Sequence, residues 1–255
     1  MRTDRVVVLT CEGATGRIAA RYLAARLPAA AVIVENPESR ALLLRRRVER
    51  LGLARVAGQL AFMLFQRMQQ QVVKGRIAEI MREVGLAARW PDAAEIIRVA
   101  SVNSPECIGH LRRLRPGAVL VVGTRIIAND VLRAVDAPFI NYHAGITPKY
   151  RGVHGGYWAR AEGDNGNFGV TVHLVDAGID TGNVLYQARL APTARDNYST
   201  YPYLQLAAAL PLLERAAEDA MAGTLRTQEV DLPSRLWSHP TLWHYLRTGW
   251  RSGAW

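Results

Sequence analysis

Residues 139–152 read FINYHAGITPKYRG, and the remainder of the chain can be placed around them. The apolar residues 118–122 and 138–140 predict two buried strands, and the second strand leads into this stretch. Asn141 and His143 are two positions apart, so an extended backbone places both side chains on one face of the sheet. The loop that follows contains Gly145 and Gly152, and glycine lets the backbone approach a ligand closely.

A second motif follows about forty residues later, where residues 169–182 read GVTVHLVDAGIDTG. This pattern predicts another strand that runs into a glycine-bracketed loop with two acids. Together the two motifs supply an amide, an imidazole and a carboxylate, which are the groups that acyl transfer requires. The amide donates to an oxyanion, the imidazole moves protons and the carboxylate orients the imidazole. A single histidine at a strand end is more often structural, but the whole combination is rare by chance.

The two motifs together resemble the formyltransferases that use 10-formyltetrahydrofolate. That family includes the glycinamide ribonucleotide, methionyl-tRNA and amino-sugar N-formyltransferases, and the resemblance covers residues 117–190. It implies 10-formyltetrahydrofolate as cosubstrate and no metal. Many members have Pro-Ser-Leu-Leu-Pro after the histidine, whereas this chain has Ala-Gly-Ile-Thr-Pro at 144–148, which leaves the acceptor open.

The resemblance also assigns roles to individual residues. It implies that Asn141, His143 and Asp180 are catalytic. It places the pterin of the folate against Arg125, Ile126 and Ile127 and against the loop Val175, Asp176, Ala177, Gly178 and Ile179. It places the acceptor, with weaker support, near Gly13, Ala14, Thr15, Tyr150, Arg151 and Gly152.

The N-terminal residues predict the start of an α/β fold. Residues 5–10 form a continuous β-branched run typical of a buried parallel strand, and a helix is expected over 17–27 after a glycine-bearing turn. A dinucleotide site is an alternative, with Glu35 as the acid that binds a ribose. The fingerprint of such a site is incomplete, because Cys11 stands where its first glycine belongs. We therefore rank this alternative below the formyltransferase.

Further strands are predicted at 95–101, 168–175 and 183–190, and further helices at 105–114, 155–162 and 198–221. The last helix is expected to be interrupted or restarted near Pro202 and Pro211. Strands that alternate with helices predict a Rossmann-like, mostly parallel sheet with helices on both faces. We expect a catalytic domain over 1–195 and a C-terminal extension over 196–255, whose tryptophans form core or a dimer interface rather than an acceptor contact.

An insertion after the second strand, at about 38–90, is predicted to be helical with breaks near Gly52, Gly58 and Gly75. Residues 40–89 hold eleven Lys or Arg and three Glu, a net +8 of the chain's +10. Such a segment either packs on the core or on a second subunit, or lies on a membrane with Phe62, Met63 and Phe65 inserted. We favour the packing role over peripheral membrane contact.

Composition narrows the remaining classes. The 255 residues include no run of eighteen apolar residues, which argues against a membrane span. Cys11 and Cys107 are too few and too far apart for a metal cluster, and they fit reduced thiols in a cytoplasmic protein. His239 and His244 likewise lack the neighbours that a metal site requires.

The function predicted from these observations is formyl transfer from 10-formyltetrahydrofolate to the amine of a small, anionic metabolite. A nucleotide-linked amino sugar is the preferred acceptor, and phosphoribosylglycinamide is the alternative. We do not expect a nucleic acid, because too little chain follows the motifs for the added barrel domain of the methionyl-tRNA members. Two competing classes are a non-catalytic folate-binding or membrane-associated module and a hydrolase that sends the formyl group to water.

Overall fold

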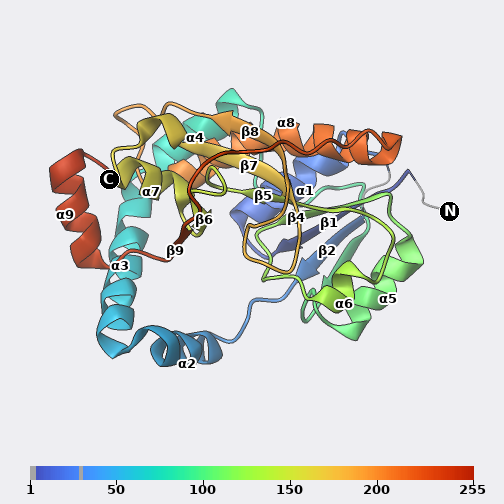
Figure 1. The fold of residues 1–255 in the computed structure, drawn as a ribbon, viewed down its shortest axis with the longest axis horizontal. Coiled ribbons are helices and arrows are strands. Elements are labelled where there is room, and N and C mark those ends of the chain that lie inside the picture. Colours follow the sequence, from blue (N-terminus) through green and yellow to red (C-terminus); the bar gives the residue numbers. More distant parts are fainter. Residues whose placement is uncertain (1–3, 29–30) are drawn as a thin grey trace.

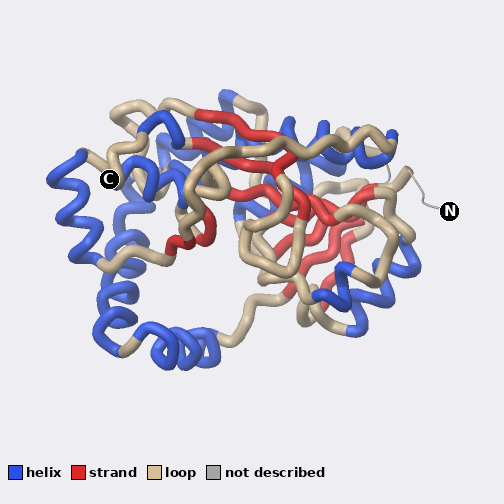
Figure 2. Tube along the Cα trace, in the orientation of Figure 1, coloured by secondary structure: helices blue, strands red, loops and turns tan. Residues whose placement is uncertain are grey.

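A seven-stranded sheet forms the centre of the computed structural model, which describes residues 4–28 and 31–255 (Figures 1 and 2). The strand order is β3-β2-β1-β4-β5-β7-β8. The strands are β1 (Val6–Cys11), β2 (Ala31–Glu35), β3 (Ile96–Val99), β4 (Ala118–Val122), β5 (Phe139–His143), β7 (Gly169–Leu174) and β8 (Val184–Arg189). Strands β1 to β5 run parallel, β7 is antiparallel to β5, and β8 is antiparallel to β7. The expected mostly parallel α/β sheet is confirmed.

Helices cover both faces of the sheet, which explains why its central strands are mostly apolar on both sides. In β1, Val6 and Val8 face a cluster with α1 (Ala14–Ala24) and α8 (Tyr201–Ala222). Val7 and Leu9 face the opposite cluster, with α5 (Pro105–Leu114) and α6 (Asn129–Leu132). Helix α5 begins as predicted, with the Ser104 hydroxyl accepting a hydrogen bond from the Cys107 amide at 3.2 Å.

Helix α8 was expected to be interrupted or restarted near Pro202 and Pro211, and it is interrupted at neither. It runs unbroken, with Pro202 in its first turn and Pro211 inside it. The helix continues through Pro211 because neighbouring side chains such as Leu210 and Leu213 are buried against the sheet, and this packing outweighs the lost hydrogen bond. A domain boundary after residue 195 would therefore separate the sheet from one of its own covering layers.

The insertion after β2 consists of α2 (Arg40–Leu51), α3 (Leu53–Val72) and α4 (Lys74–Glu83). The predicted break at Gly52 is confirmed, whereas Gly58 and Gly75 lie within helices and the second break falls at Val73. Gly58 faces the tail of the chain, where an added Cβ atom would lie 3.0 Å from Cβ of Thr241. That glycine permits a close helix contact rather than a turn. Helix α2 extends away from the sheet (Figure 1).

An aromatic cluster joins α3 to α7 (Gly155–Ala161) and α9 (Leu242–Ser252). Phe62 is 1% exposed, and its ring centroid lies 4.8 Å from that of Tyr198 and 4.9 Å from that of Tyr245. The favoured packing role thus holds for Phe62, and the alternative in which this ring inserts into a membrane is wrong, because the ring is part of the core. Trp237 is buried in the same cluster, as expected for core. No helix of the described residues combines the length and hydropathy that crossing a membrane requires.

The tail of the chain returns to the central loop through a pair of two-residue strands. Strand β6 (Arg151–Gly152) pairs in parallel with β9 (Leu236–Trp237). Gly152 has φ +95, and an added Cβ atom would lie 2.3 Å from the carbonyl oxygen of Trp237, so only glycine fits this pairing. A short 3-10 helix (Asn165–Asn167) precedes β7.

Candidate active site

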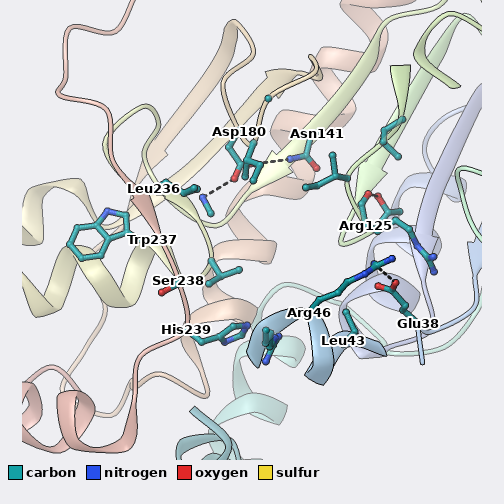
Figure 3. Close-up of a pocket in the computed structure, with 18 of the residues that line it drawn as sticks. Glu38, Leu43, Arg46, Arg125, Asn141, Asp180, Leu236, Trp237, Ser238 and His239 are labelled. Atoms are coloured by element: carbon teal, nitrogen blue, oxygen red, sulfur yellow. Dashed lines mark hydrogen bonds and ion pairs between the residues drawn. The ribbon is translucent and has the colours of Figure 1, made fainter. Parts of the chain in front are cut away.

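A cavity of about 990 Å³ lies beyond the carboxyl ends of β4 and β5. Ligands of open α/β sheets bind at this edge. Figure 3 shows Asn141 and Asp180 on one side of the cavity and Arg46 with Glu38 on the opposite side. The tail closes a third side with residues 236–239.

Asp180 is surrounded by nitrogen atoms from several elements. One carboxylate oxygen accepts from the Gly152 amide at 2.9 Å and lies 3.3 Å from Nδ1 of His143. The other lies 3.5 Å from Nε2 of His173 and 3.5 Å from Nδ2 of Asn141. Burial alone would raise the pKa of Asp180. The neighbouring imidazoles of His173 and His143 and the amide of Gly152 outweigh it and lower the pKa to about 2. Asp180 is therefore ionised at neutral pH.

Asn141 and His173 are direct partners across β5 and β7. Nδ1 of His173 donates to the carbonyl of Leu174 at 2.8 Å, which leaves Nε2 to accept from Nδ2 of Asn141 at 3.1 Å. The second hydrogen of that amide has only the long 3.5 Å contact to Asp180. The cavity thus presents an amide hydrogen available to a ligand oxygen.

His173 was not among the residues predicted for the site. The sequence does contain a signal for it, because β5 and β7 are both short strands with polar residues in their last positions or next to them. Their antiparallel pairing brings His173 opposite Asn141. That pairing follows from the strand order and cannot be read from either motif alone.

His143 is buried behind Asp180 and does not contribute to the cavity wall described above. Its Nε2 donates to the carbonyl of Tyr150 at 2.6 Å, so the titrating nitrogen is Nδ1, which faces Asp180. Burial lowers the pKa of His143, and the charge of Asp180 only partly opposes this. The expected role of the imidazole in moving protons can therefore reach the cavity only through Asp180.

Most residues predicted to contact folate line the cavity, in two facing groups. The wall includes Arg125, Ile126, Ile127, Val175, Asp176, Gly178 and Ile179, while Ala177 lies outside it. Gly178 donates its amide to Asp176 at 3.0 Å, and the Thr181 hydroxyl donates to Asp176 at 2.7 Å. These bonds give the second group a fixed loop shape.

Glu35 organises the first group and is not available to a ribose. Its carboxylate accepts from the Arg125 amide at 2.7 Å and from Nε of Arg125 at 2.6 Å. Because Glu35 is buried, its charge requires this partner. The carbonyl of Ile126 also accepts from Asn103 at 2.9 Å. The Arg125 amide and the Ile126 carbonyl therefore already have hydrogen-bond partners within the protein. Because Glu35 is bound to Arg125, it cannot bind a ribose, which argues against the dinucleotide alternative.

The residues predicted for the acceptor are mostly elsewhere. Gly152 lines the cavity, but Gly13, Ala14 and Thr15 at the start of α1 do not. Tyr150 is buried, and its hydroxyl donates to Asp164 at 2.8 Å. Arg151 turns toward the carbonyl of Ile179, at 3.2 Å. Tyr150 and Arg151 therefore mainly stabilise the shape of the loop that contains them.

An arginine wall that we did not predict faces the catalytic side. It consists of Arg46, Arg47, Arg50 and Arg55, which line the cavity from α2 and α3. Arg46 pairs with Glu38 at 2.7 Å, and Arg55 donates to the Ser238 hydroxyl at 3.1 Å. In the described part of the chain, Arg47, Arg50 and Arg55 form no ion pair with a carboxylate. The wall holds positive charge in excess.

Comparison with known proteins identifies the fold and the sequence family. The chain is 36% identical over 159 residues to a methionyl-tRNA formyltransferase of Anaeromyxobacter sp. (strain K), covering 57% of this chain and 51% of that protein. A methionyl-tRNA formyltransferase of Pelotomaculum thermopropionicum is 37% identical over 106 residues, covering 41% of this chain and 34% of that protein. The chain thus spans about half the length, or less, of these curated relatives.

Among solved structures, a sugar N-formyltransferase from Shewanella sp. has a TM-score of 0.56 at 13% identity, covering 91% of this chain and 75% of that chain. A phosphoribosylglycinamide formyltransferase from Streptococcus pneumoniae has a TM-score of 0.52 at 17% identity, covering 87% of this chain and 98% of that chain. These likenesses show a shared fold. The family model described as formyl transferase matches residues 66–203, more than half of the chain, so the chain belongs to the formyl transferase family.

Proposed function

We propose that the protein is an N-formyltransferase that moves a formyl group from 10-formyltetrahydrofolate to the amine of a small anionic metabolite. The observation that supports this most is the convergence of Asn141, His173 and Asp180 at one end of a cavity of about 990 Å³. An amide donor, an imidazole and an ionised carboxylate are the groups that a tetrahedral intermediate of acyl transfer needs.

The reaction forms one C–N bond and breaks another. The acceptor amine attacks the formyl carbon, and the carbonyl oxygen becomes an oxyanion that accepts a hydrogen bond from the side-chain amide of Asn141. Asp180 takes the amine proton, directly or through a water molecule, and passes it to N10 of the folate, which leaves protonated as its bond to the formyl carbon breaks. His143 acts through Asp180 in this scheme, because its Nδ1 lies 3.3 Å from that carboxylate. The scheme uses no metal.

The folate fits between the two groups of the cavity wall that lie around Arg125 and Gly178. Its pterin packs against two loops whose shapes Glu35 and Asp176 fix by accepting hydrogen bonds from the amides of Arg125 and Gly178. The remaining space, toward the arginine wall, is left for the acceptor.

The arginine wall favours an acceptor that carries phosphate, and a nucleotide-linked amino sugar is our first choice. Phosphoribosylglycinamide, which also has an amine and a phosphate, is the alternative. Methionyl-tRNA is the substrate in the names of the curated relatives, but this chain spans only part of them. The free thiols Cys11 and Cys107 fit the cytoplasmic location that we expect.

The test mixes purified protein, 10-formyltetrahydrofolate and a panel of amines that includes nucleotide amino sugars and phosphoribosylglycinamide. We expect tetrahydrofolate release that depends on one amine, together with a formyl mass increase in that amine. Formate release without any amine would indicate the hydrolase. Folate binding without turnover across the panel would indicate the non-catalytic module, and either result would overturn the proposal.

A further inference from the structure

Helix α3 is apolar on its outward face as well as on its buried face. Its inner face carries Phe62 in the aromatic cluster. Its outward face carries large apolar side chains whose exposed fractions run from 45% to 85%: Leu53, Leu60, Leu64, Met68 and Val72. A helix that borders water normally places polar residues outward. These positions recur at helical spacing, so they form one continuous stripe along α3.

Helix α9 lies beside α3 and repeats the pattern (Figure 1). Tyr245 faces the core, whereas Trp243 is 72% exposed and Trp250 is 90% exposed, with Leu246 between them. We call the outward residues of α3 and α9 together the outer face: Leu53, Leu60, Leu64, Met68, Val72, Trp243, Leu246 and Trp250. An indole left in water at a helix surface is costly, whereas at a lipid headgroup boundary its apolar body and polar N–H are both accommodated.

The charge around the outer face has a single sign. The two helices that carry the outer face, α3 and α9, hold four arginines and no Asp or Glu, a net +4; one of the four, Arg55, lines the cavity, as do three arginines of α2. Helix α4 of the same insertion is different, because it mixes signs and Arg76 pairs there with Glu79 and Asp196. Within this part of the molecule, charge of one sign is thus a feature of the two helices that carry the outer face.

We propose that the outer face docks this protein on the surface of a bilayer that contains anionic lipid. Exposed leucine, methionine and tryptophan on two helices that carry arginine and no acidic residue match an interface of acyl chains beneath negative headgroups. A second copy of the chain fits less well, because it would bring two surfaces of net positive charge together. An RNA would use the arginines but would leave the leucines of α3 in water.

This docking differs from the one considered from sequence. The buried side of α3, with Phe62, stays in the core, as a packing helix requires. The opposite side of the same helix meets the lipid, and the tail supplies the tryptophans.

The test is co-sedimentation of the whole protein with vesicles of phosphatidylcholine alone or of phosphatidylcholine with about one-third phosphatidylglycerol. We expect binding to the anionic vesicles that weakens as salt is raised. Leu64→Gln with Met68→Gln, and separately Trp250→Ser, should each lower the apparent affinity about tenfold, because each removes a buried apolar group from the docked state. Val84→Gln, a half-exposed valine at the end of α4, is the matched control and should bind normally.

Charge is tested by Arg247→Gln with Arg251→Gln, which should weaken binding to the anionic vesicles about tenfold, with Arg112→Gln on α5 as the control. All the altered side chains are exposed, so thermal unfolding should be unchanged.

The docking proposal is rejected if anionic vesicles fail to retain the protein at low salt, or if the Trp250 and Leu64 variants bind normally. A dimer that Trp250→Ser dissociates, without vesicle binding, would assign the face to a second copy. RNA binding that needs the arginines but not Trp250, again without vesicle binding, would assign the surface to RNA.

The proposed formyl transfer can fail without affecting this inference. The outer-face variants should transfer formyl to a dissolved acceptor at the normal rate. Loss of vesicle binding with normal turnover in any of them separates the two properties.

Discussion

Asp180 connects the parts of the candidate site. It holds a left-handed backbone conformation, φ +50, which is uncommon outside glycine but tolerated by aspartate. Its carboxylate accepts from Gly152 and faces both His143 and His173. A residue held in such a conformation by several neighbours is characteristic of functional sites.

Removing the donor or the carboxylate should lower turnover and spare folate binding. Asn141→Ala removes the oxyanion donor and should reduce kcat about 10²- to 10³-fold. Asp180→Asn keeps the shape and removes the charge, so it should reduce kcat with little change in the Kd for folate. The double variant should be scarcely slower than the slower single variant, because both residues act on one intermediate. Single-turnover kinetics and equilibrium folate binding measure the two quantities.

His143 offers a control on this assignment. Because it contacts Asp180 and not the cavity, His143→Ala should lower kcat without changing the KM for the acceptor. Near-normal transfer by folded Asn141→Ala and His143→Ala proteins would show that the chemistry occurs elsewhere.

The protonation of His143 should depend on Asp180. Burial lowers the pKa of His143, and the carboxylate of Asp180 raises it part of the way back. In Asp180→Asn that opposing charge is lost, so the pKa of His143 should fall further and the imidazole should stay neutral to lower pH. Histidine resonances followed through a pH titration by NMR measure the shift. An unchanged or raised pKa would refute the electrostatic link.

The acid side of the pH–rate profile has a related constraint. The pKa of Asp180 is lowered to about 2, so its carboxylate stays ionised as pH falls through the range of an ordinary aspartate. Asp180 should therefore contribute no loss of activity until pH approaches that value. If the rate falls on acidification while the pH is still well above the pKa of Asp180, other groups are responsible, and the histidines are the first candidates.

At the scale of elements, the loop between β7 and β8 depends on a close approach at Gly178. An added Cβ atom there would lie 1.9 Å from the Thr181 hydroxyl, which is itself bonded to Asp176. The constraint is thus contact with Thr181, and a positive φ plays no part. Gly178→Val should displace Thr181, disturb the Asp176 turn and weaken folate affinity about tenfold or more.

Equilibrium binding of folate measures that effect, and Gly166→Ala is a matched control because nothing lies near its added Cβ atom. Normal folate affinity in a folded Gly178→Val protein would rule out this placement of the pterin.

The elements that could be predicted from sequence are those with long, one-sided patterns. Strand β4 and helix α5 were placed to the residue, because a buried apolar run and a Ser-Pro-Glu start are local signals. The helix breaks at Gly58 and Pro211 were misplaced, since tertiary packing overrides both residues. Strands β6 and β9 are two residues long, and their pairing depends on segments about eighty residues apart. No local sequence pattern predicts such a pairing.

The site divides in the same way. Asn141, His143 and Asp180 lie in recognisable motifs and do come together. The arginine wall could not be foreseen, because its position depends on how α2 and α3 leave the sheet. The sequence shows only that these arginines exist.

At the scale of the whole molecule, the arginine wall predicts which acceptors the protein prefers. Arg47→Ala with Arg50→Ala should raise the KM for a phosphate-bearing acceptor about tenfold or more and leave kcat nearly unchanged, because both charges are remote from the reacting carbon. Arg45→Ala is the control, since Arg45 lies on the same helix but pairs with Glu49 outside the cavity wall. Steady-state kinetics at several acceptor concentrations give both constants. An unchanged KM would contradict the proposal that the arginine wall binds the phosphate of the acceptor.

The pairing of β6 with β9 also has a consequence for how the protein is made. Residues 236–239, which close one side of the cavity, follow the last strand of the sheet by more than forty residues, so a ribosome adds them well after the sheet is complete. The sheet can assemble during synthesis, since its strands end at Arg189, but the binding cavity stays open until the C-terminal segment returns across the central loop. Contacts so distant in sequence form late in folding. The nascent protein therefore has its scaffold well before it has a closed binding site.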